Sequence, residues 1–87
     1  IDNNNFIIHS AYIYTMKKIK KIKIKVNGKN KIVLENTNML ELIKILKIPL
    51  KKVAIELNQE IIDKRNLKQI VLNKSDKIEV VHFIGGG

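Results

Sequence analysis

Apolar and basic residues alternate over a short stretch in the first third of the chain, Ile22-Lys23-Ile24-Lys25-Val26. A period of two is typical of a strand with one buried face, so the stretch predicts a strand whose solvent face is a row of lysines. Such a row also discourages pairing with another sheet edge. Asn27-Gly28 supplies the positive φ angles of a tight hairpin turn, and Ile32-Val33-Leu34 returns as the second strand.

A helical pattern begins after Asn38. Glu41 follows three residues later, which resembles a capping box with Asn38 in the capping role. Pro49 is expected to end the helix, because the residue before a proline is pushed out of helical geometry. Apolar residues at i, i+3, i+4 and i+7 form one stripe, which is expected in the core: Met39, Leu42, Ile43 and Leu46.

Strand patterns return in the second half of the chain. A third strand is predicted at 53–57, a turn at Asn58-Gln59, a short return strand at 60–62 and a final strand at 78–81, after a turn at 73–76. Residues 63–68 are polar and are expected to be irregular, with Leu67 tucked beneath them. The ββαββ order predicts an α+β fold, a mixed four- to five-stranded sheet with one main helix packed across one face.

Composition excludes several classes of protein. The 87 residues hold at most one domain. There is no Cys, hence no disulfide, thiolate zinc site or cysteine nucleophile, and no apolar run is long enough to span a membrane. With two His and no catalytic or metal-binding cluster, a self-contained active site, a bound cofactor and a metal site are not expected.

The net charge of +9 suggests a polyanionic partner, but its make-up argues against one. All but one of the 17 basic residues are Lys, the exception being Arg65, and Phe83 is the only aromatic residue after Met16. RNA-binding modules usually add aromatic residues for stacking and Arg for bidentate contacts. An RNA-binding module with this same α+β fold therefore stays as the alternative from another class, and the lysines are interpreted as compositional background.

The two ends of the chain differ from the middle. Residues 1–15 carry one charge, Asp2, and end just before Met16, so they are interpreted as a disordered leader or an added extension. A single domain is predicted over residues 16–87. It ends His82-Phe83-Ile84-Gly85-Gly86-Gly87, and three glycines after an apolar strand predict a flexible tail with a free carboxylate at its tip.

Three segments together resemble the ThiS family of sulfur carriers, which have the ubiquitin-like β-grasp fold. They are residues 26–29 in the first hairpin, residues 53–62 in the middle, and residues 76–87 at the end. Some positions depart from the family pattern: Gln59 and Ser75 stand where Gly is usual, and Asp63 where Pro often stands. Asn73 is expected to supply the left-handed conformation in the last turn.

The resemblance implies that the protein is a co-substrate and not an enzyme. A ThiF-like adenylating enzyme would use ATP and Mg²⁺ to activate the Gly87 carboxylate, and sulfur delivered from a cysteine desulfurase would convert it to a thiocarboxylate. Thiazole synthase (ThiG-like) would then take the sulfur into the thiazole of thiamine, in the cytoplasm. Gly85 and Gly86 would thread into partner active sites, while Phe83 and Ile84 would dock, although core packing of Phe83 is an equal alternative.

Two other carriers of the same class remain open, the small subunit of molybdopterin synthase and a tRNA-thiolation carrier. The first tends to have prolines shortly before its terminal glycines, whereas the only proline here is Pro49. Neither His82 nor the pair Glu56 and Glu60 has a partner at a spacing that predicts catalysis. The thiamine pathway is therefore the preferred interpretation.

Overall fold

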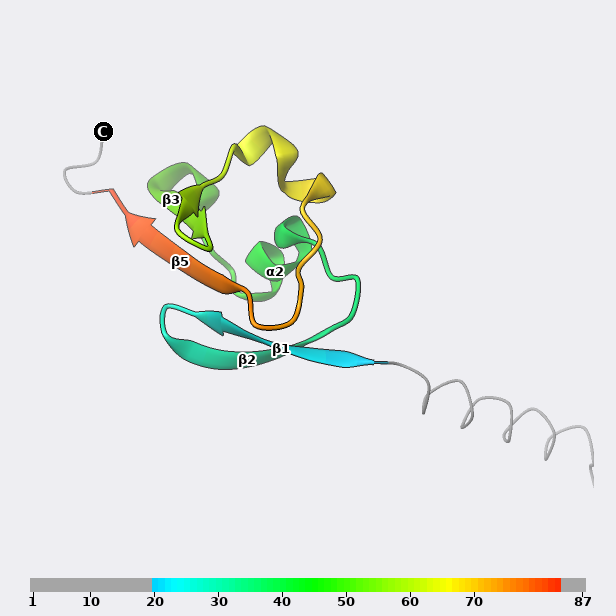
Figure 1. Cartoon of the computed structure of the whole chain (residues 1–87). Helices are drawn as coiled ribbons and strands as arrows, with labels where there is room; N and C mark the ends of the chain where they lie inside the picture. Colours follow the sequence, from blue (N-terminus) through cyan, green and yellow to red (C-terminus); the bar gives the residue numbers. More distant parts are fainter. Residues whose placement is uncertain (1–19, 84–87) are drawn as a thin grey trace, which may run out of the picture.

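Five strands form one mixed sheet in a computed structural model that describes residues 20–83 (Figure 1). The strand order across the sheet is β2-β1-β5-β3-β4, so β5, the last strand in the sequence, lies in the centre. The pairing is antiparallel except between β1 and β5, which run parallel. The bounds are β1 Lys21–Val26, β2 Lys29–Leu34, β3 Val53–Leu57, β4 Glu60–Ile61 and β5 Lys77–His82. The expected α+β architecture is confirmed, with five strands.

The first hairpin has the predicted alternation. In β1 the side chain of Ile24 is fully buried and its Lys neighbours are exposed. Asn27 (φ 50°) and Gly28 (φ 81°) both adopt positive φ, the requirement of a tight hairpin turn whose twist matches that of the strands. This geometry fixes the register, in which Val26 lies opposite Lys29.

The helix α2 (Met39–Ile45) begins with the predicted capping box. The Asn38 side chain accepts a hydrogen bond from the Glu41 backbone N–H at 2.8 Å, and the Glu41 carboxylate accepts one from the Asn38 N–H at 3.5 Å. Together they satisfy two of the N–H groups that a helix start leaves without partners.

The end of α2 differs from the expectation at Pro49, because the chain leaves the helix before it reaches the proline. Lys47 adopts a left-handed conformation (φ 55°), its N–H donates to the Lys44 carbonyl and the Ile48 N–H donates to the Ile43 carbonyl. These two bonds form a Schellman motif, which satisfies the last carbonyls of a helix. Lysine at the left-handed position, where glycine is usual, gave no signal in the sequence.

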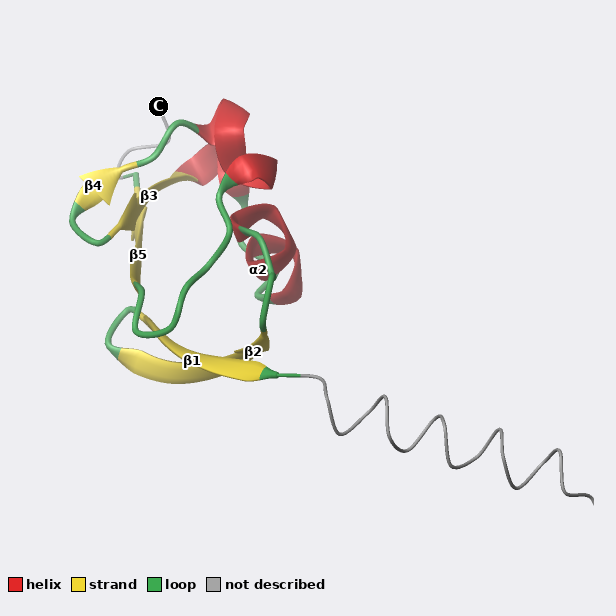
Figure 2. Cartoon of the chain, turned by 45° about the vertical axis from the view of Figure 1, so that its right-hand side comes forward, coloured by secondary structure: helices red, strands yellow, loops and turns green. Residues whose placement is uncertain are grey.

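The core lies between α2 and one face of the sheet, as Figure 2 shows. Three of the four residues of the predicted stripe are buried, and Leu46 is half-buried against them. The buried apolar residues are Ile24, Met39, Leu42, Ile43, Val53, Ile55, Leu67, Leu72 and Ile78.

Two short 3₁₀ helices complete the described chain, η1 (Leu50–Lys52) and η2 (Lys64–Gln69). The expectation of irregular structure after β4 is therefore corrected for η2. Asp63 caps the start of this helix, because its carboxylate accepts a hydrogen bond from the Arg65 N–H at 2.8 Å. Leu67 is buried beneath it, as predicted.

The described residues begin within the predicted domain. The interpretation of residues 1–15 as a leader, and of Met16 as the start of the domain, concerns residues outside the described range. Between residues 20 and 83 no helix has the length and apolar character needed to cross a membrane.

Candidate interaction site at the end of the central strand

The central strand β5 holds the segment that precedes the glycines. Its backbone continues the ladder with β3 beyond the last strand residue, because the Phe83 N–H donates to the Lys52 carbonyl at 2.9 Å. Ile84, Gly85, Gly86 and Gly87 lie outside the described residues, so their docking, threading and modification stay predictions. The structure thus defines where their path begins, at Phe83.

Phe83 is 54% exposed, so the alternative of core packing at the strand end is wrong. The Lys64 Nζ lies 5.4 Å from the centre of its ring, within the range of a cation–π contact, and also donates a hydrogen bond to the Leu50 carbonyl. Lys64 comes from η2 and Leu50 from η1, so two separate segments meet beside the aromatic ring. The docking role of Phe83 remains a prediction.

Apolar side chains are exposed on the face of the sheet away from α2, near the end of β5. Val81 is 51% exposed and Ile61, on β4, is 74% exposed. Ala54 lies opposite Val81 in the register, and residues opposite each other in a sheet share a face. An apolar surface made of Ile61, Val81 and Ala54 therefore lies beside the segment that leads to the glycines.

The acidic residues of this region do not form an acid–base pair. Glu56 lies opposite Glu79 in the β3–β5 ladder and opposite Ile61 in the β3–β4 ladder, whereas Glu60 lies opposite Leu57. Consecutive strand positions point to opposite faces, so Glu56 and Glu60 occupy different faces of the sheet. His82 is exposed, and the described part of the chain has no cluster of residues suited to holding a metal ion.

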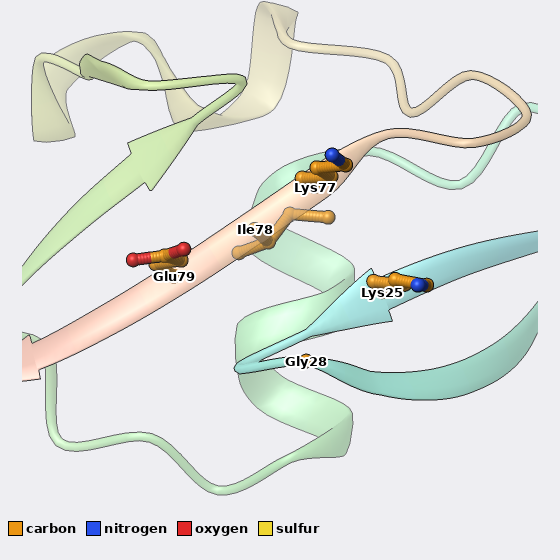
Figure 3. Close-up of a pocket in the computed structure, with 5 residues that line it drawn as sticks. All are labelled: Lys25, Gly28, Lys77, Ile78 and Glu79. Carbon is orange, nitrogen blue, oxygen red and sulfur yellow. The ribbon is translucent and has the colours of Figure 1, made fainter.

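Three lysines gather where β1 meets β5. Lys25 lies opposite Lys77 in the parallel ladder, and Lys23 lies two positions earlier on the same face of β1. Two shallow hollows of about 210 and about 140 Å³ lie among them, and Figure 3 shows the first, lined by Lys25, Gly28, Lys77, Ile78 and Glu79. No described acidic residue forms an ion pair with these lysines, and although Glu79 lines the first hollow, the lysines give this area a net positive charge.

The ion pair observed among the described residues is local to η2. The Arg65 guanidinium hydrogen-bonds the Asp63 carboxylate, with the closest N–O distance 2.6 Å. These side-chain bonds, with the bond from the Arg65 backbone N–H, lower the pKa of Asp63 to about 2. Both side chains are largely exposed, so we assign the pair no role in the chemistry.

A polar network joins the two turns at the start of β5 and was not found by sequence reasoning. Buried Asp76 accepts hydrogen bonds from the Asn58 side chain at 3.0 Å and from the Asn73 N–H at 2.7 Å. Asn58 in turn accepts from the Lys77 N–H at 2.9 Å. The network fixes the start of β5 against the β3–β4 turn. Asn58 and Asp76 are 18 positions apart in the sequence, so no local sequence pattern predicts their contact.

The positive φ in the last turn belongs to Ser75 (φ 70°), and Asn73 is not among the residues with positive φ, so the expectation for Asn73 is wrong. In the β3–β4 turn, Asn58 (φ 51°) and Gln59 (φ 74°) both adopt positive φ. The conformations normally supplied by glycine are therefore kept at both positions, although the residues are Gln59 and Ser75.

The strand order, the parallel pairing of β1 with β5 and the helix across one face define a β-grasp domain. Known proteins share this arrangement. The ThiS family model matches residues 20–87. The crystal structure of a thiamine biosynthesis protein (ThiS) from Geobacter metallireducens is 32% identical with a TM-score of 0.68, over 76% of this chain and 100% of that one. The chain therefore belongs to the ThiS family.

Two curated relatives add detail. The sulfur carrier protein ThiS of Bacillus subtilis is 49% identical over 37 residues, which are 42% of this chain and 56% of that protein. The thiazole synthase of Paramagnetospirillum magneticum is 36% identical over 66 residues, or 76% of this chain. The chain spans only 20% of the length of that thiazole synthase, so the similar region is a small part of the larger protein.

Proposed function

We propose that this protein is a sulfur carrier of thiamine biosynthesis, with its chemistry on Gly87. Membership of the ThiS family is the observation that carries the proposal. The thiazole synthases that contain a region similar to this chain support thiazole synthase as the acceptor of the sulfur. They also favour the thiamine pathway over the molybdopterin and tRNA-thiolation alternatives.

The proposed reaction begins at the Gly87 carboxylate, a poor electrophile. An ATP-dependent adenylating enzyme, with Mg²⁺, joins the carboxylate oxygen to the α-phosphate of ATP and releases pyrophosphate, so AMP becomes the leaving group. The terminal sulfur of a persulfide supplied by a cysteine desulfurase then displaces AMP and forms an acyl disulfide. A thiol reductant cleaves the S–S bond of this acyl disulfide and leaves the thiocarboxylate. ATP and Mg²⁺ belong to the enzyme, and the carrier is its substrate.

The fold supports this role by presenting the tail and a surface for docking. The central strand β5 is bonded on both sides near its start and runs to His82, just before the residues that lead to the glycines (Figure 1). The apolar surface of Ile61, Val81 and Ala54 lies beside that exit and has the exposure expected of a docking surface. Gly85 and Gly86 lack Cβ atoms and so fit a narrow channel that leads to the reacting carboxylate.

Intact-mass measurement tests the proposal. The protein is incubated with ATP, Mg²⁺, a sulfur source and the adenylating enzyme of the same organism, and a gain of about 16 Da is expected as sulfur replaces oxygen at Gly87. A variant with one residue appended after Gly87 should fold like the original protein but gain no mass. Thiolation of that extended variant would exclude Gly87 as the reacting residue.

A second measurement separates the pathways. The thiolated carrier is mixed with thiazole synthase or with the large subunit of molybdopterin synthase, and loss of the 16 Da increment is followed in each. We expect the increment to be lost with thiazole synthase. Loss only with the molybdopterin enzyme would exclude the thiamine assignment but not the carrier chemistry.

A further inference from the structure

The two edges of β5 differ in how their backbone groups are used. The Phe83 N–H bonds the Lys52 carbonyl, and the Asn58 N–H bonds the Lys77 carbonyl. Hydrogen-bonded and non-hydrogen-bonded pairs alternate along an antiparallel ladder, so every second residue of β5 bonds to β3. The intervening residues, Ile78, Val80 and His82, therefore direct their N–H and C=O groups to the opposite edge, which faces β1.

The first hairpin occupies only the beginning of that edge. The parallel ladder stops at the pair of Val26 with Ile78, and the Asn27 N–H then donates to the Ile78 carbonyl at 2.9 Å. The side-chain oxygen of Asn27 accepts a hydrogen bond from the Val80 N–H at 2.8 Å. This bond replaces the one that a further residue of β1 would make if the ladder continued. Within residues 20–83, the Val80 carbonyl and the N–H and carbonyl of His82 have no hydrogen-bond partner.

This free edge begins where the β1–β2 turn ends. Figures 1 and 3 show β5 continuing past that turn, and the hollow of about 210 Å³ lined by Gly28, Ile78 and Glu79 lies beside the same turn. His82 is exposed here, and the Asn27 side chain bonds this edge at the Val80 N–H. The unbonded backbone groups of Val80 and His82 are therefore available to another strand.

We propose that the free edge of β5 at Val80 and His82 pairs with an extended backbone segment of the adenylating enzyme. The proposal rests on the proposed function. Because β5 leads directly into the segment that carries Gly87, the enzyme that acts on Gly87 is the partner expected to reach this edge. An enzyme that holds the chain in extended form by main-chain hydrogen bonds must use one of the two edges of the strand. Because β3 and the Lys52 carbonyl occupy one edge as far as Phe83, the enzyme strand adds to the other.

Amide hydrogen exchange of the ¹⁵N-labelled carrier tests this pairing, alone and bound to the adenylating enzyme. In the free protein the His82 amide should exchange rapidly, whereas the amides of Val81 and Phe83, which bond to β3, should be protected. In the complex, exchange at His82 should slow by at least about tenfold, as expected for one new main-chain hydrogen bond. Val81 and Phe83 serve as internal controls because their bonds are present in both states.

A pair of variants gives a second test. His82→Pro removes the proposed donor, while His82→Ala removes the imidazole and keeps the N–H. We expect His82→Pro to weaken enzyme binding about tenfold and His82→Ala to bind like the original protein. The His82 N–H bonds to nothing in the described domain, so the urea midpoint should change little in either variant. The hydrogen-exchange experiment uses the original protein and therefore does not depend on the folding of a variant.

The possible failures can be told apart. If the carrier is thiolated but His82 exchanges as fast in the complex as alone, the strand pairing is wrong and the proposed function stands. If the enzyme neither binds nor thiolates the carrier, the proposed function fails and this proposal with it. Equal binding by the Pro and Ala variants would also overturn the pairing.

Discussion

Replacing Ser75 by glycine should stabilise the domain. Ser75 has φ 70°, a left-handed conformation that costs an L-residue about 1–2 kcal/mol. Glycine pays roughly 0.5–1 kcal/mol in additional chain entropy on folding, so the net gain is about 0.5–1 kcal/mol. The exposed Ser75 hydroxyl makes no hydrogen bond in the described structure, so the replacement loses no contact that would offset this gain.

Urea unfolding of the original protein and of Ser75→Gly measures the difference, with thermal unfolding as a check. A gain of this size should raise the melting temperature by roughly 2–8 °C in a domain of this length. Lys74→Gly is the matched control, since Lys74 lies in the same turn without a positive φ and glycine there should destabilise. If Ser75→Gly loses as much stability as Lys74→Gly, the left-handed conformation is not a source of strain.

The same argument predicts that Gln59→Gly (φ 74°) is stabilising by a similar amount. The double variant tests coupling. The Asn58–Asp76 hydrogen bond links the two turns, so the two gains should not be fully additive.

The remaining predictions concern hydrogen bonds. Asp76→Ala removes two bonds to a buried carboxylate and should lower the free energy of unfolding in urea by about 3 kcal/mol; a loss below about 0.5 kcal/mol would contradict the network. Asn38→Ala removes the cap of α2 and should cost about 1 kcal/mol in the same assay, against an unchanged Asn66→Ala. An NMR titration should give Asp63 a pKa of about 2, and this pKa should rise in Arg65→Gln, but not fully to the ordinary aspartate value, because the bond from the backbone N–H of residue 65 remains. Because folding lowers this pKa, the pair's small contribution to stability should be present above about pH 4 and lost towards pH 2. An Asp63 pKa that is unchanged in Arg65→Gln would refute the Arg65 side chain as a cause of the lowered pKa.

Local patterns predicted most of the secondary structure. Asn27-Gly28 and the Asn38–Glu41 capping box act within a few residues, so the residue types alone determine the hydrogen bonds they make. The Schellman end at Lys47 was missed because lysine adopts a conformation there that residue preference assigns to glycine. Its cost is offset by the carbonyls that the motif satisfies and by the packing of α2, neither of which is a local property.

The candidate site was predicted less completely. The family resemblance pointed to Phe83 and the glycines, but the exposure of Phe83 and its contact with Lys64 depend on where η1 and η2 meet β5. The free edge at His82 likewise depends on two ladders that join distant parts of the chain. Such pairings come from tertiary packing, which an alternating pattern does not encode.

The central position of β5 has a consequence for the synthesis and turnover of the protein. β1 and β3 are joined through β5, so the sheet cannot close until residues 77–82 have left the ribosome, and folding must wait for most of the domain to be made. A protease that cuts within β5 would remove the bridge between the two halves of the sheet. The product would be an unfolded fragment, cleared by quality control, instead of a folded, tailless competitor for the partners of the intact protein.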